Sequence, residues 1–320
     1  MKIGMVSDSL SHLALKELLL TSRELGVSGI EFNTGNWSAG KHFDLATFSA
    51  DQQAARDFRT MVEDHGLSVI ALNANGNQLH PTDGARQDKV VRDTIRAAGH
   101  MGVDKVCLMS GLPGAGPDEQ FPNWIVSSWP PETQTILAWQ WAEKLIPYWT
   151  SLARFARDHG VEKLCVELHG NQLVFNVPTL LALREAVGPV VGANLDPSHL
   201  MWMGADPLAA MEALGSAVYH VHAKDTWING RAAATRSRLE NGPLDKVSDR
   251  AWSYITLGFG KSQEWWKEFV YRLRLLGYDG WLSIEHEDVA FSRREGVERS
   301  VAVLNQAVPF ERPDFAPQAI

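Results

Sequence analysis

The sequence has little cysteine and no long hydrophobic run. Its 320 residues include two cysteines, Cys107 and Cys165, each inside a short apolar segment. Because a buried thiol behaves as a small hydrophobe, we expect neither a disulfide framework nor a cysteine metal cage. No apolar run is long enough to span a bilayer, and the start "MKIGMVSDSL" lacks a secretory apolar stretch. We therefore expect a soluble, cytoplasmic protein that does not act at a membrane.

The sequence also lacks an excess of basic residues. Lys and Arg number 30 against 38 Asp and Glu, which gives a formal net charge of −8. A protein that binds nucleic acid through its phosphates needs a basic face, so we expect no nucleic-acid partner. Hydrophobic residues make up 45% of the chain without biased tracts, which argues against disordered and fibrous classes. A chain of this kind can bury one core, and we expect a single domain over residues 1–320.

Short apolar runs alternate with longer stretches of helical periodicity, which is the pattern of repeated βα units. The runs that we interpret as strands are 2–8, 28–34, 67–74, 105–111, 163–169, 191–197, 218–225 and 280–287. The helical candidates between them are 51–65, 84–102, 133–159, 178–187, 206–214, 264–276 and 293–307. Eight strands in such a repeat predict an α/β fold, a closed (β/α)8 TIM barrel rather than an open sheet.

Two long insertions interrupt this rhythm. The first, residues 111–134, follows the fourth strand, and the second, about 226–263, follows the seventh. Long loops in a compact domain are usually functional or disordered, and the tryptophans in both segments argue against disorder. Two interpretations stay open. The loops are lids or aromatic platforms over the barrel mouth, or they pack there for stability or for a subunit contact.

Polar residues gather at the C-terminal ends of the candidate strands. They are Asp8, Asn33, Asn73, Ser110, Glu167, His169, Asp196, His222 and Glu285. In barrel enzymes this face carries the chemistry. The alternative is that charged residues only mark where strands leave the core, but that explanation fits poorly when eight strand ends share the same habit. We therefore expect an active site at this end of the barrel.

Four consecutive strands offer Glu167, Asp196, His222 and Glu285 toward one barrel mouth. Carboxylates ~4 Å apart repel by about 4 kcal/mol per pair at an effective dielectric near 20. Protonation or the neighbouring Lys224 could offset this repulsion, but a divalent cation does so most directly. Oxygen and imidazole donors without thiolates suit Mn²⁺, Mg²⁺, Co²⁺, Ni²⁺ or Zn²⁺. We therefore expect these four side chains to bind one divalent metal, with a salt-bridged core cluster as the alternative.

Other histidines lie close to the predicted ligands in the sequence. By strand parity, His169 faces inward and is placed to touch whatever the metal holds. His199, on the turn after the sixth strand, is placed to bind substrate or to cap the metal. His220 lies deeper in the barrel and is expected to be structural, and parity turns His286 away from the site.

The segments "DPSH" (196–199) and "HVHAKD" (220–225) resemble the xylose-isomerase-like TIM-barrel superfamily of sugar isomerases and epimerases, and the similarity covers nearly the whole chain. The keto-sugar 3-epimerases of that superfamily bind one divalent metal, commonly manganese. The resemblance implies this role for Glu167, Asp196, His222 and Glu285. It further implies that the two glutamates exchange protons with the substrate carbon from opposite faces, and that His199 contacts the substrate. The expected function is removal of a proton next to the carbonyl of a keto-sugar.

Other segments resemble a narrower group, the catalytic subunits of 3-keto-glycoside lyases, including C-glycoside deglycosidases. These segments are "PNW…WPP", "WQW.EKLIPYW", "ANLDPSHLMWMG", "HVHAKDT" and "LG.G". The resemblance implies an alternative function, a β-elimination that releases an aglycone, with His169 as the candidate general base. Some of these lyases pair with a small β-sandwich subunit, whereas the epimerases often form homo-oligomers, so either kind of partner is open.

The expected ligand is a small sugar or glycoside. We expect its pocket to be shaped by His199, Trp37, Lys224 and the "LGFG" segment, which contains Gly258 and Gly260. A general base placed on the substrate contributes ~10²–10⁴-fold to the rate.

Two further interpretations compete with these enzymes. An endonuclease-IV-like DNA repair enzyme needs additional ligands for a trinuclear zinc site and a surface that tolerates phosphates, and the acidic balance argues against it. A non-catalytic carbohydrate-binding barrel would keep the tryptophans but could lose a metal ligand, and this sequence keeps all four.

Overall fold

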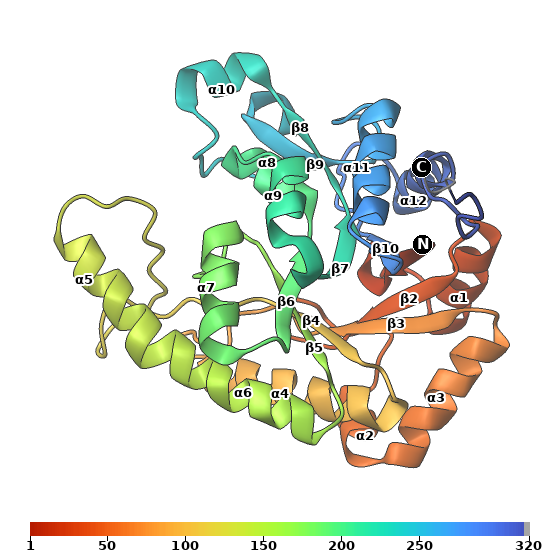
Figure 1. The fold of residues 1–320 in the computed structure, drawn as a ribbon, viewed down its shortest axis with the longest axis horizontal. Helices are drawn as coiled ribbons and strands as arrows, with labels where there is room; N and C mark the ends of the chain where they lie inside the picture. The colour runs from red at the N-terminus through yellow and green to blue at the C-terminus, as the bar shows by residue number, and fades with distance from the viewer. Residues whose placement is uncertain (317–320) are drawn as a thin grey trace.

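A computed structural model of the chain describes residues 1–316, in which eight parallel strands close into a barrel (Figure 1). The barrel strands are β1 (Lys2–Val6), β2 (Gly29–Asn33), β3 (Ser68–Asn73), β4 (Lys105–Leu108), β5 (Lys163–Glu167), β6 (Val191–Leu195), β7 (Val218–Ala223) and β10 (Trp281–Ile284). Around the barrel each strand pairs with its neighbour in sequence, and β10 closes the ring between β7 and β1. The predicted (β/α)8 barrel is confirmed.

Helices surround the barrel, and most of them have buried apolar side chains. They are α1 (Leu15–Glu24), α2 (Leu45–Ala50), α3 (Gln52–Asp64), α4 (Gly84–Met101), α5 (Glu132–Trp139), α6 (Ile146–Asp158), α7 (Val177–Val187), α8 (Pro197–Met203), α9 (Pro207–Leu214), α10 (Gly230–Arg236), α11 (Gln263–Leu275) and α12 (Arg293–Asn305). A π-helical turn at Gln140–Leu145 joins α5 to α6, so the stretch predicted over 133–159 is one long helical rod. Within residues 1–316, none of these helices has the length and hydropathy needed to cross a membrane.

The N-terminal end of the barrel is packed shut. Glycines lie at Gly4 on β1 and at Gly29 on β2 because large side chains occupy the space above them. A Cβ atom at Gly29 would lie 2.3 Å from Ile70 Cγ2 and 2.9 Å from Trp281 Cζ3, and one at Gly4 would lie 2.4 Å from Ile70 Cδ1. Interiors are packed at crystal-like density, so neither position has room for a larger residue. The barrel can therefore open to a ligand at its C-terminal end.

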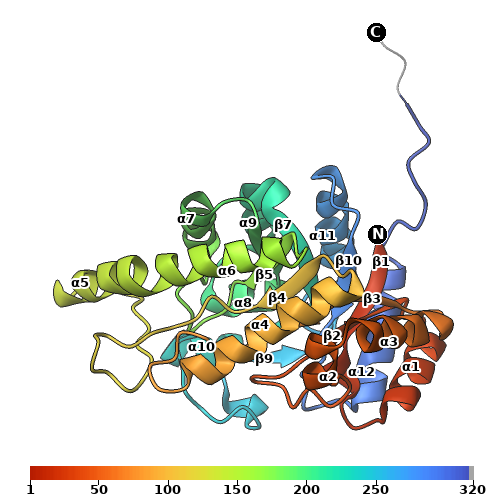
Figure 2. The ribbon, with the colours of Figure 1, turned by 90° about the horizontal axis from the view of Figure 1, so that it is seen from below.

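Both predicted insertions reach this C-terminal end. The second folds into a two-stranded antiparallel sheet, β8 (Asp225–Ile228) with β9 (Trp252–Ile255), and α10 lies between the two strands in sequence. Figures 1 and 2 show α5 projecting from one side of the barrel, and Figure 1 shows α10 next to β8 and β9. The expectation of long loops after the fourth and seventh strands omitted this small sheet, because its strands are only four residues long and lie 23 residues apart.

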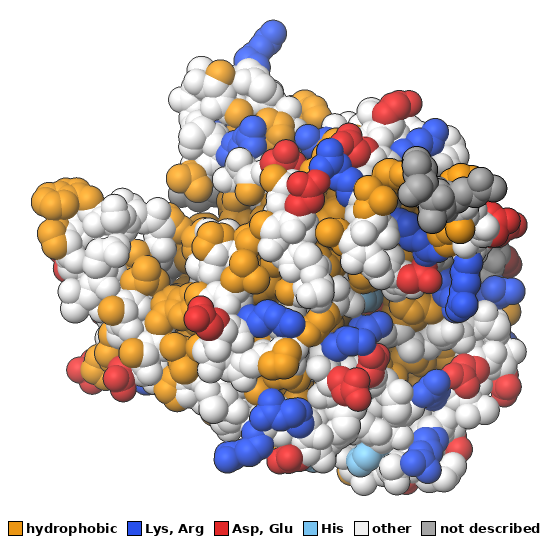
Figure 3. All heavy atoms as spheres, viewed as in Figure 1, with side chains coloured by type: hydrophobic (Ala, Val, Ile, Leu, Met, Phe, Trp, Pro, Cys, Tyr) orange, Lys and Arg blue, Asp and Glu red, His pale blue; other side chains and the backbone are white. Residues whose placement is uncertain are grey.

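The projecting segment around α5 carries apolar side chains on its surface. Phe121 and Trp129 are each 75% exposed. A groove of about 590 Å³ runs between this segment and α7, and its walls include Trp124, Leu137 and Phe175. Apolar side chains gather over this region in the space-filling view (Figure 3). The first insertion therefore presents an apolar surface to solvent as well as contributing Trp124 to the barrel mouth.

Candidate metal centre and active site

The four predicted metal ligands lie together at the C-terminal mouth of the barrel. Glu167 ends β5, Asp196 follows β6, His222 lies near the end of β7, and Glu285 follows β10. Each offers a ligand atom, and these four atoms all lie within 4.8 Å of one another. Three of the residues are fully buried, and Glu285 is partly exposed to the cavity above them. Strand register alone therefore gathers residues that are 118 positions apart in the sequence.

In Asp196 and in Glu167, one of the two carboxylate oxygens accepts hydrogen bonds from neighbouring residues. Asp196 begins α8, and its Oδ1 accepts a hydrogen bond from Ser198 N at 2.8 Å. Glu167 Oε2 accepts from Asn75 Nδ2 at 3.0 Å and from Asn194 Nδ2 at 3.1 Å. Such bonds fix the rotamers of the two carboxylates, as an N-cap does for the start of a helix. The other oxygens, Glu167 Oε1 and Asp196 Oδ2, lie 2.9 and 3.3 Å from His199 Nε2.

Buried polar atoms of the predicted ligands that lack a hydrogen-bond partner indicate that this site can bind a cation. Among the described residues, Asp196 Oδ2 and His222 Nδ1 are buried and have no hydrogen-bond partner. His222 Nδ1 lies 3.2 Å from Glu285 Oε2 and 3.3 Å from Glu167 Oε2. Buried polar atoms are nearly always satisfied, so unpaired atoms that point at one place indicate a ligand site. Carboxylate oxygens and one imidazole nitrogen are a donor set that suits a divalent cation.

Two carboxyl groups of the site, Glu167 and Glu285, have lowered pKa values. Burial alone would raise the pKa of Glu167, but the imidazoles of His199 and His222 lower it well below its usual range. Burial would likewise raise the pKa of Glu285, but Lys224 and His222 lower it to about 2. Both groups are therefore ionised at neutral pH. The mouth of the barrel concentrates negative charge that an additional cation would stabilise.

Lys224 supplies one positive charge to this cluster. Its Nζ lies 2.6 Å from Glu285 Oε2 and 3.1 Å from Glu287 Oε2. It also lies 3.2 Å from Asp196 Oδ2 and 4.7 Å from the centre of the Tyr254 ring. Burial would lower the pKa of Lys224, but these carboxylates raise it well above its ordinary value. The ammonium group is thus saturated by carboxylates and is held beside the predicted ligands.

His199 lies against the predicted ligands, as the sequence suggested. Its Nε2 is 2.9 Å from Glu167 Oε1 and 3.3 Å from Asp196 Oδ2. Its Nδ1 lies 2.9 Å from the Tyr254 hydroxyl oxygen. The imidazole ring of His169 lies only 4.1 Å away, centre to centre. His199 therefore connects the carboxylates to the wall of the cavity.

His169 keeps one ring nitrogen free toward the cavity. Its Nδ1 contacts the carbonyl oxygen of Gly170, and because a carbonyl only accepts, Nδ1 must carry the proton. Burial and the neighbouring His199 lower the pKa of His169 to about 3. The neutral ring thus keeps its lone pair on Nε2. The Trp37 ring lies 6.0 Å from this imidazole, and both residues line the cavity.

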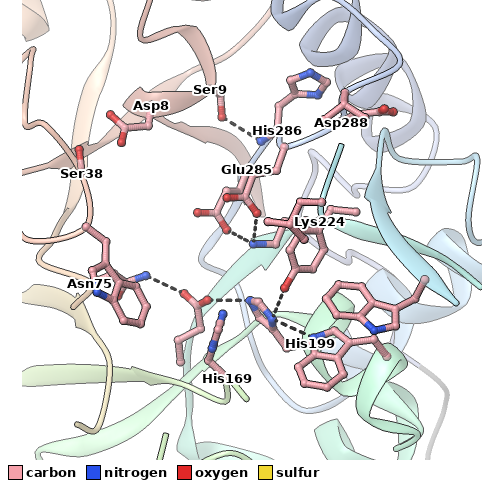
Figure 4. Close-up of a pocket in the computed structure, with 18 of the residues that line it drawn as sticks. Asp8, Ser9, Ser38, Asn75, His169, His199, Lys224, Glu285, His286 and Asp288 are labelled. Carbon is pink, nitrogen blue, oxygen red and sulfur yellow. Dashed lines mark hydrogen bonds and ion pairs between the residues drawn. The ribbon is translucent and has the colours of Figure 1, made fainter. Parts of the chain in front are cut away.

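A cavity of about 1190 Å³ opens above the cluster. In Figure 4, Glu285 and Lys224 lie on one side of it and His169 and His199 on another. Within the described chain, its acidic lining residues are Asp8, Glu167, Glu240, Glu285, Glu287 and Asp288, and its lysine and arginine residues are Lys224 and Arg293. The aromatic lining residues include Trp37, Trp124, Trp202, Trp252, Tyr254 and Phe291. The Trp202 and Trp252 rings stack at 4.8 Å with 7° between their planes, so α8 and the second insertion form one aromatic wall.

Comparison with known proteins identifies the family. A family model described as a xylose isomerase-like TIM barrel matches residues 20–307. The chain belongs to the xylose isomerase-like TIM-barrel family. The resemblance that the sequence motifs indicated is thereby confirmed at the level of the family.

Relatives of this family member have been found in sequence and in structure. The uncharacterized protein YfiH of Bacillus subtilis (strain 168) is 42% identical over 311 residues, which cover 96% of this chain and 99% of that protein. Three solved structures share the fold at low identity. They are a probable 3-DHS dehydratase, AsbF, from Bacillus anthracis (16% identity, TM-score 0.66, 95% of this chain and 99% of that one), an L-ribulose 3-epimerase (16%, 0.64, 96% and 94%) and an IOLI protein with a zinc atom (18%, 0.63, 96% and 98%).

Gly258 and Gly260 do not lie where the sequence suggested. We expected them to shape the pocket, but the cavity lining does not include them. In this xylose isomerase-like barrel their N–H groups donate to Asp225 Oδ2 at 3.1 and 3.3 Å, and Trp266 Nε1 donates to the same oxygen at 3.2 Å. A Cβ atom at Gly260 would lie 2.4 Å from the Thr226 carbonyl oxygen. These glycines therefore fasten the second insertion to the barrel.

Replacing the buried carboxylate of Asp225 tests whether it holds the second insertion against the barrel. Asp225→Asn puts an NH2 group opposite N–H donors and leaves them unsatisfied, which is expected to lower the free energy of unfolding by about 2–3 kcal/mol in urea denaturation. Asp279→Asn is the matched control, because Asp279 is exposed and pairs with the Met1 amino group at 2.7 Å. The control is expected to lose at most about 1 kcal/mol. Equal losses in the two variants would contradict the role of Asp225.

Glu31, on β2, is a buried residue of the site that sequence reasoning missed. It accepts hydrogen bonds from Asn73 Nδ2 at 2.8 Å, from His220 Nε2 at 2.8 Å and from His222 Nε2 at 3.0 Å. Burial would raise the pKa of Glu31, but His222 and His220 lower it well below the usual range. A signal was present, because Glu31 lies between Ile and Phe inside the strand "GIEFN" and a carboxylate there requires a buried partner.

Proposed function

We propose that the protein is a divalent-metal-dependent enzyme that removes a proton next to the carbonyl of an uncharged keto-sugar, as sugar isomerases and epimerases do. The observation that carries the proposal is the convergence of Glu167, Asp196, His222 and Glu285 beside a large cavity, which Glu167 and Glu285 line. A cation held by these four residues, manganese by analogy with the family, would stabilise the negative charge that develops on the carbonyl oxygen.

The arrangement of bases supports proton transfer at two positions around the substrate. Glu285 reaches the cavity from β10, and Glu167 reaches it from β5. One carboxylate takes the proton from carbon and becomes protonated. Return of that proton to the neighbouring carbon gives the isomer, whereas a proton that reaches the other face from solvent, through the other carboxylate or His169 Nε2, gives the epimer. His199, between Glu167 and the Tyr254 hydroxyl group, is placed to orient a substrate hydroxyl group.

The charges that line the cavity favour an uncharged substrate. Carboxylates outnumber lysine and arginine side chains among the lining residues. Lys224 is already paired with Asp196, Glu285 and Glu287. A phosphorylated sugar or a nucleic-acid phosphate would meet six carboxylates against the two cations Lys224 and Arg293, and would be repelled on balance. This balance argues for a neutral sugar and against a DNA repair activity.

Exchange of carbon-bound protons with solvent tests the proposal. The Mn²⁺-loaded protein is incubated in D2O with D-tagatose, L-ribulose, D-fructose, methyl 3-keto-β-D-glucoside and the phosphate esters of the ketoses, and deuterium is followed by NMR. We expect deuterium next to the carbonyl of at least one neutral compound, slower exchange on its phosphate ester, and loss of exchange after chelation. Absence of exchange in every neutral compound, or exchange that survives removal of the metal, would overturn the proposal.

The size of the cavity favours a second candidate function, β-elimination from a keto-glycoside. At about 1190 Å³ the cavity exceeds the range of about 300–1,000 Å³ that is typical of ligand pockets. The aromatic wall of Trp124, Trp202 and Trp252 offers a surface for a group attached to the sugar. In this reaction the base takes the proton from carbon, and the electrons of the broken C–H bond form a carbon–carbon double bond. The bond to the aglycone breaks, and the aglycone leaves with a proton. Release of free aglycone from a 3-keto-glycoside in the same NMR assay decides between the two outcomes.

A further inference from the structure

We propose that Glu31 positions His222 for metal binding by fixing which ring nitrogen carries the proton, a role that rests on the metal site of the proposed function. The imidazole of His222 lies between two groups of carboxylates. Its Nε2 is 3.0 and 3.1 Å from the two oxygens of Glu31. Its Nδ1 is 3.2 Å from Glu285 Oε2 and 3.3 Å from Glu167 Oε2.

The chemistry of a neutral imidazole makes this geometry decisive. Such a ring has one N–H group and one lone pair, and a metal ligand must present the lone pair to the cation. Because an ionised carboxylate only accepts hydrogen bonds, Glu31 holds the proton on Nε2 of His222. Nδ1 is then left with its lone pair toward the other carboxylates. Carboxylates that orient a ligating histidine in this way contribute ~10–100-fold to metal affinity.

The surroundings of Glu31 are built to keep it ionised while it is fully buried. An unpaired buried carboxylate is very unfavourable. His220 Nε2 donates to Oε2 at 2.8 Å and Asn73 Nδ2 donates to Oε1 at 2.8 Å, so each oxygen accepts one bond besides that of His222. The segment "HVH" therefore has two functions. His220 donates a hydrogen bond that holds Glu31 in place, and His222 donates its own hydrogen bond to the same carboxylate.

The same group of residues is a poor second metal site. Glu31, His220 and His222 bring ligand atoms within 4.8 Å of Cys107 Sγ. His220 Nε2, His222 Nε2 and both oxygens of Glu31, however, already bond to one another. The carboxylate therefore acts through His222 and is a positioning residue.

Glu31→Gln tests this role with metal binding as the readout. The amide replaces one acceptor oxygen with an NH2 group and removes the negative charge, so the N–H donors of His220, His222 and Asn73 compete for one neutral oxygen and the Nε2–H form of His222 is held less firmly. We expect the dissociation constant for Mn²⁺, measured by competition with a fluorescent chelator, to rise ~10–100-fold. Cys107→Ser is the control, because it changes the same part of the barrel core without contacting the proposed metal centre. It is expected to keep the wild-type dissociation constant.

A spectroscopic measurement separates positioning from a structural effect. In the metal-free protein labelled with 15N at histidine, we expect the neutral His222 ring to carry its proton on Nε2 in the wild type and in Cys107→Ser, and to populate the Nδ1–H form in Glu31→Gln. If Glu31→Gln does not fold, Glu31→Asp shortens the side chain by one methylene and is expected to weaken Mn²⁺ binding several-fold.

The outcomes distinguish this inference from the proposed function. Wild-type Mn²⁺ affinity in a folded Glu31→Gln or Glu31→Asp protein, with the proton of His222 still on Nε2, would overturn the positioning role and leave the metal site intact. Failure of the wild-type protein to bind any divalent cation would overturn the proposed function, and the role of Glu31 with it.

Discussion

Glu285→Gln is expected to abolish the exchange of the acidic carbon-bound proton of the substrate with D2O. Glutamine keeps the size of the side chain but cannot take a proton, and a general base of this kind contributes ~10²–10⁴-fold to the rate. Its neutral oxygen is also a weaker metal ligand than a carboxylate. The exchange rate at saturating Mn²⁺ is measured by NMR, together with the metal content of the variant. Because Glu285 is the most exposed of the four predicted ligands, we expect the variant to fold.

Glu287→Gln is the matched control for this experiment. Glu287 also contacts Lys224 Nζ, at 3.1 Å, and lines the same cavity, but its side chain is 49% exposed. It is absent from the group of converging ligand atoms. We expect its exchange rate to stay within a few-fold of the wild type. Retained exchange in Glu285→Gln, or an equal loss in both variants, would refute the assignment of Glu285.

Removal of the metal is expected to lower the thermal stability of the protein. A ligand that binds only the folded state at 100 times its dissociation constant adds about 2.7 kcal/mol. For a chain of this length, that corresponds to a shift of about 4 °C in the melting temperature. Differential scanning calorimetry after chelation and again after addition of Mn²⁺ measures this shift. An unchanged melting temperature at saturating Mn²⁺ would count against a metal site in the barrel mouth.

Asp196→Asn provides the internal comparison for the thermal experiment. Asparagine caps a helix as well as aspartate does, so the hydrogen bond to Ser198 N at the start of α8 can be kept. The other oxygen, Oδ2, which lies 3.2 Å from Lys224 Nζ, however, is replaced by an NH2 group and its negative charge is lost. We expect this variant to fold but to show little or no shift with Mn²⁺. A full shift would mean that the cation binds elsewhere.

Much of the barrel and of its mouth follows from local sequence patterns. Buried parallel strands are continuous apolar runs, and their C-terminal ends share one side of the barrel. Glu167 and Asp196 could therefore be placed together without knowledge of the loops. The same reasoning separated His220 from His222 by depth. These inferences need only the period of a strand and the closure of the barrel.

Other parts of the site depend on contacts that no local pattern contains. Glu31 meets its histidine partners across the barrel interior, 189 and 191 residues away in the sequence. Gly258 and Gly260 lie in a segment that looks like a flexible pocket loop, and their binding to Asp225 depends on how the second insertion folds back. Sequence periodicity describes one element at a time, whereas these interactions arise from the packing of several elements.

Because the N-terminal end of the barrel is filled by side chains, the cavity opens only at the C-terminal end of the described barrel. Among residues 1–316, Ile70 and Trp281 fill the space above Gly4 and Gly29 and so block a passage along the barrel axis at that end. A product must leave by the route through which the substrate came, past the segment that carries Trp124 and the hairpin that carries Trp252. Substrate entry and product release therefore both depend on these two insertions rather than on the barrel. A bound product prevents the next substrate from binding until it has dissociated past them.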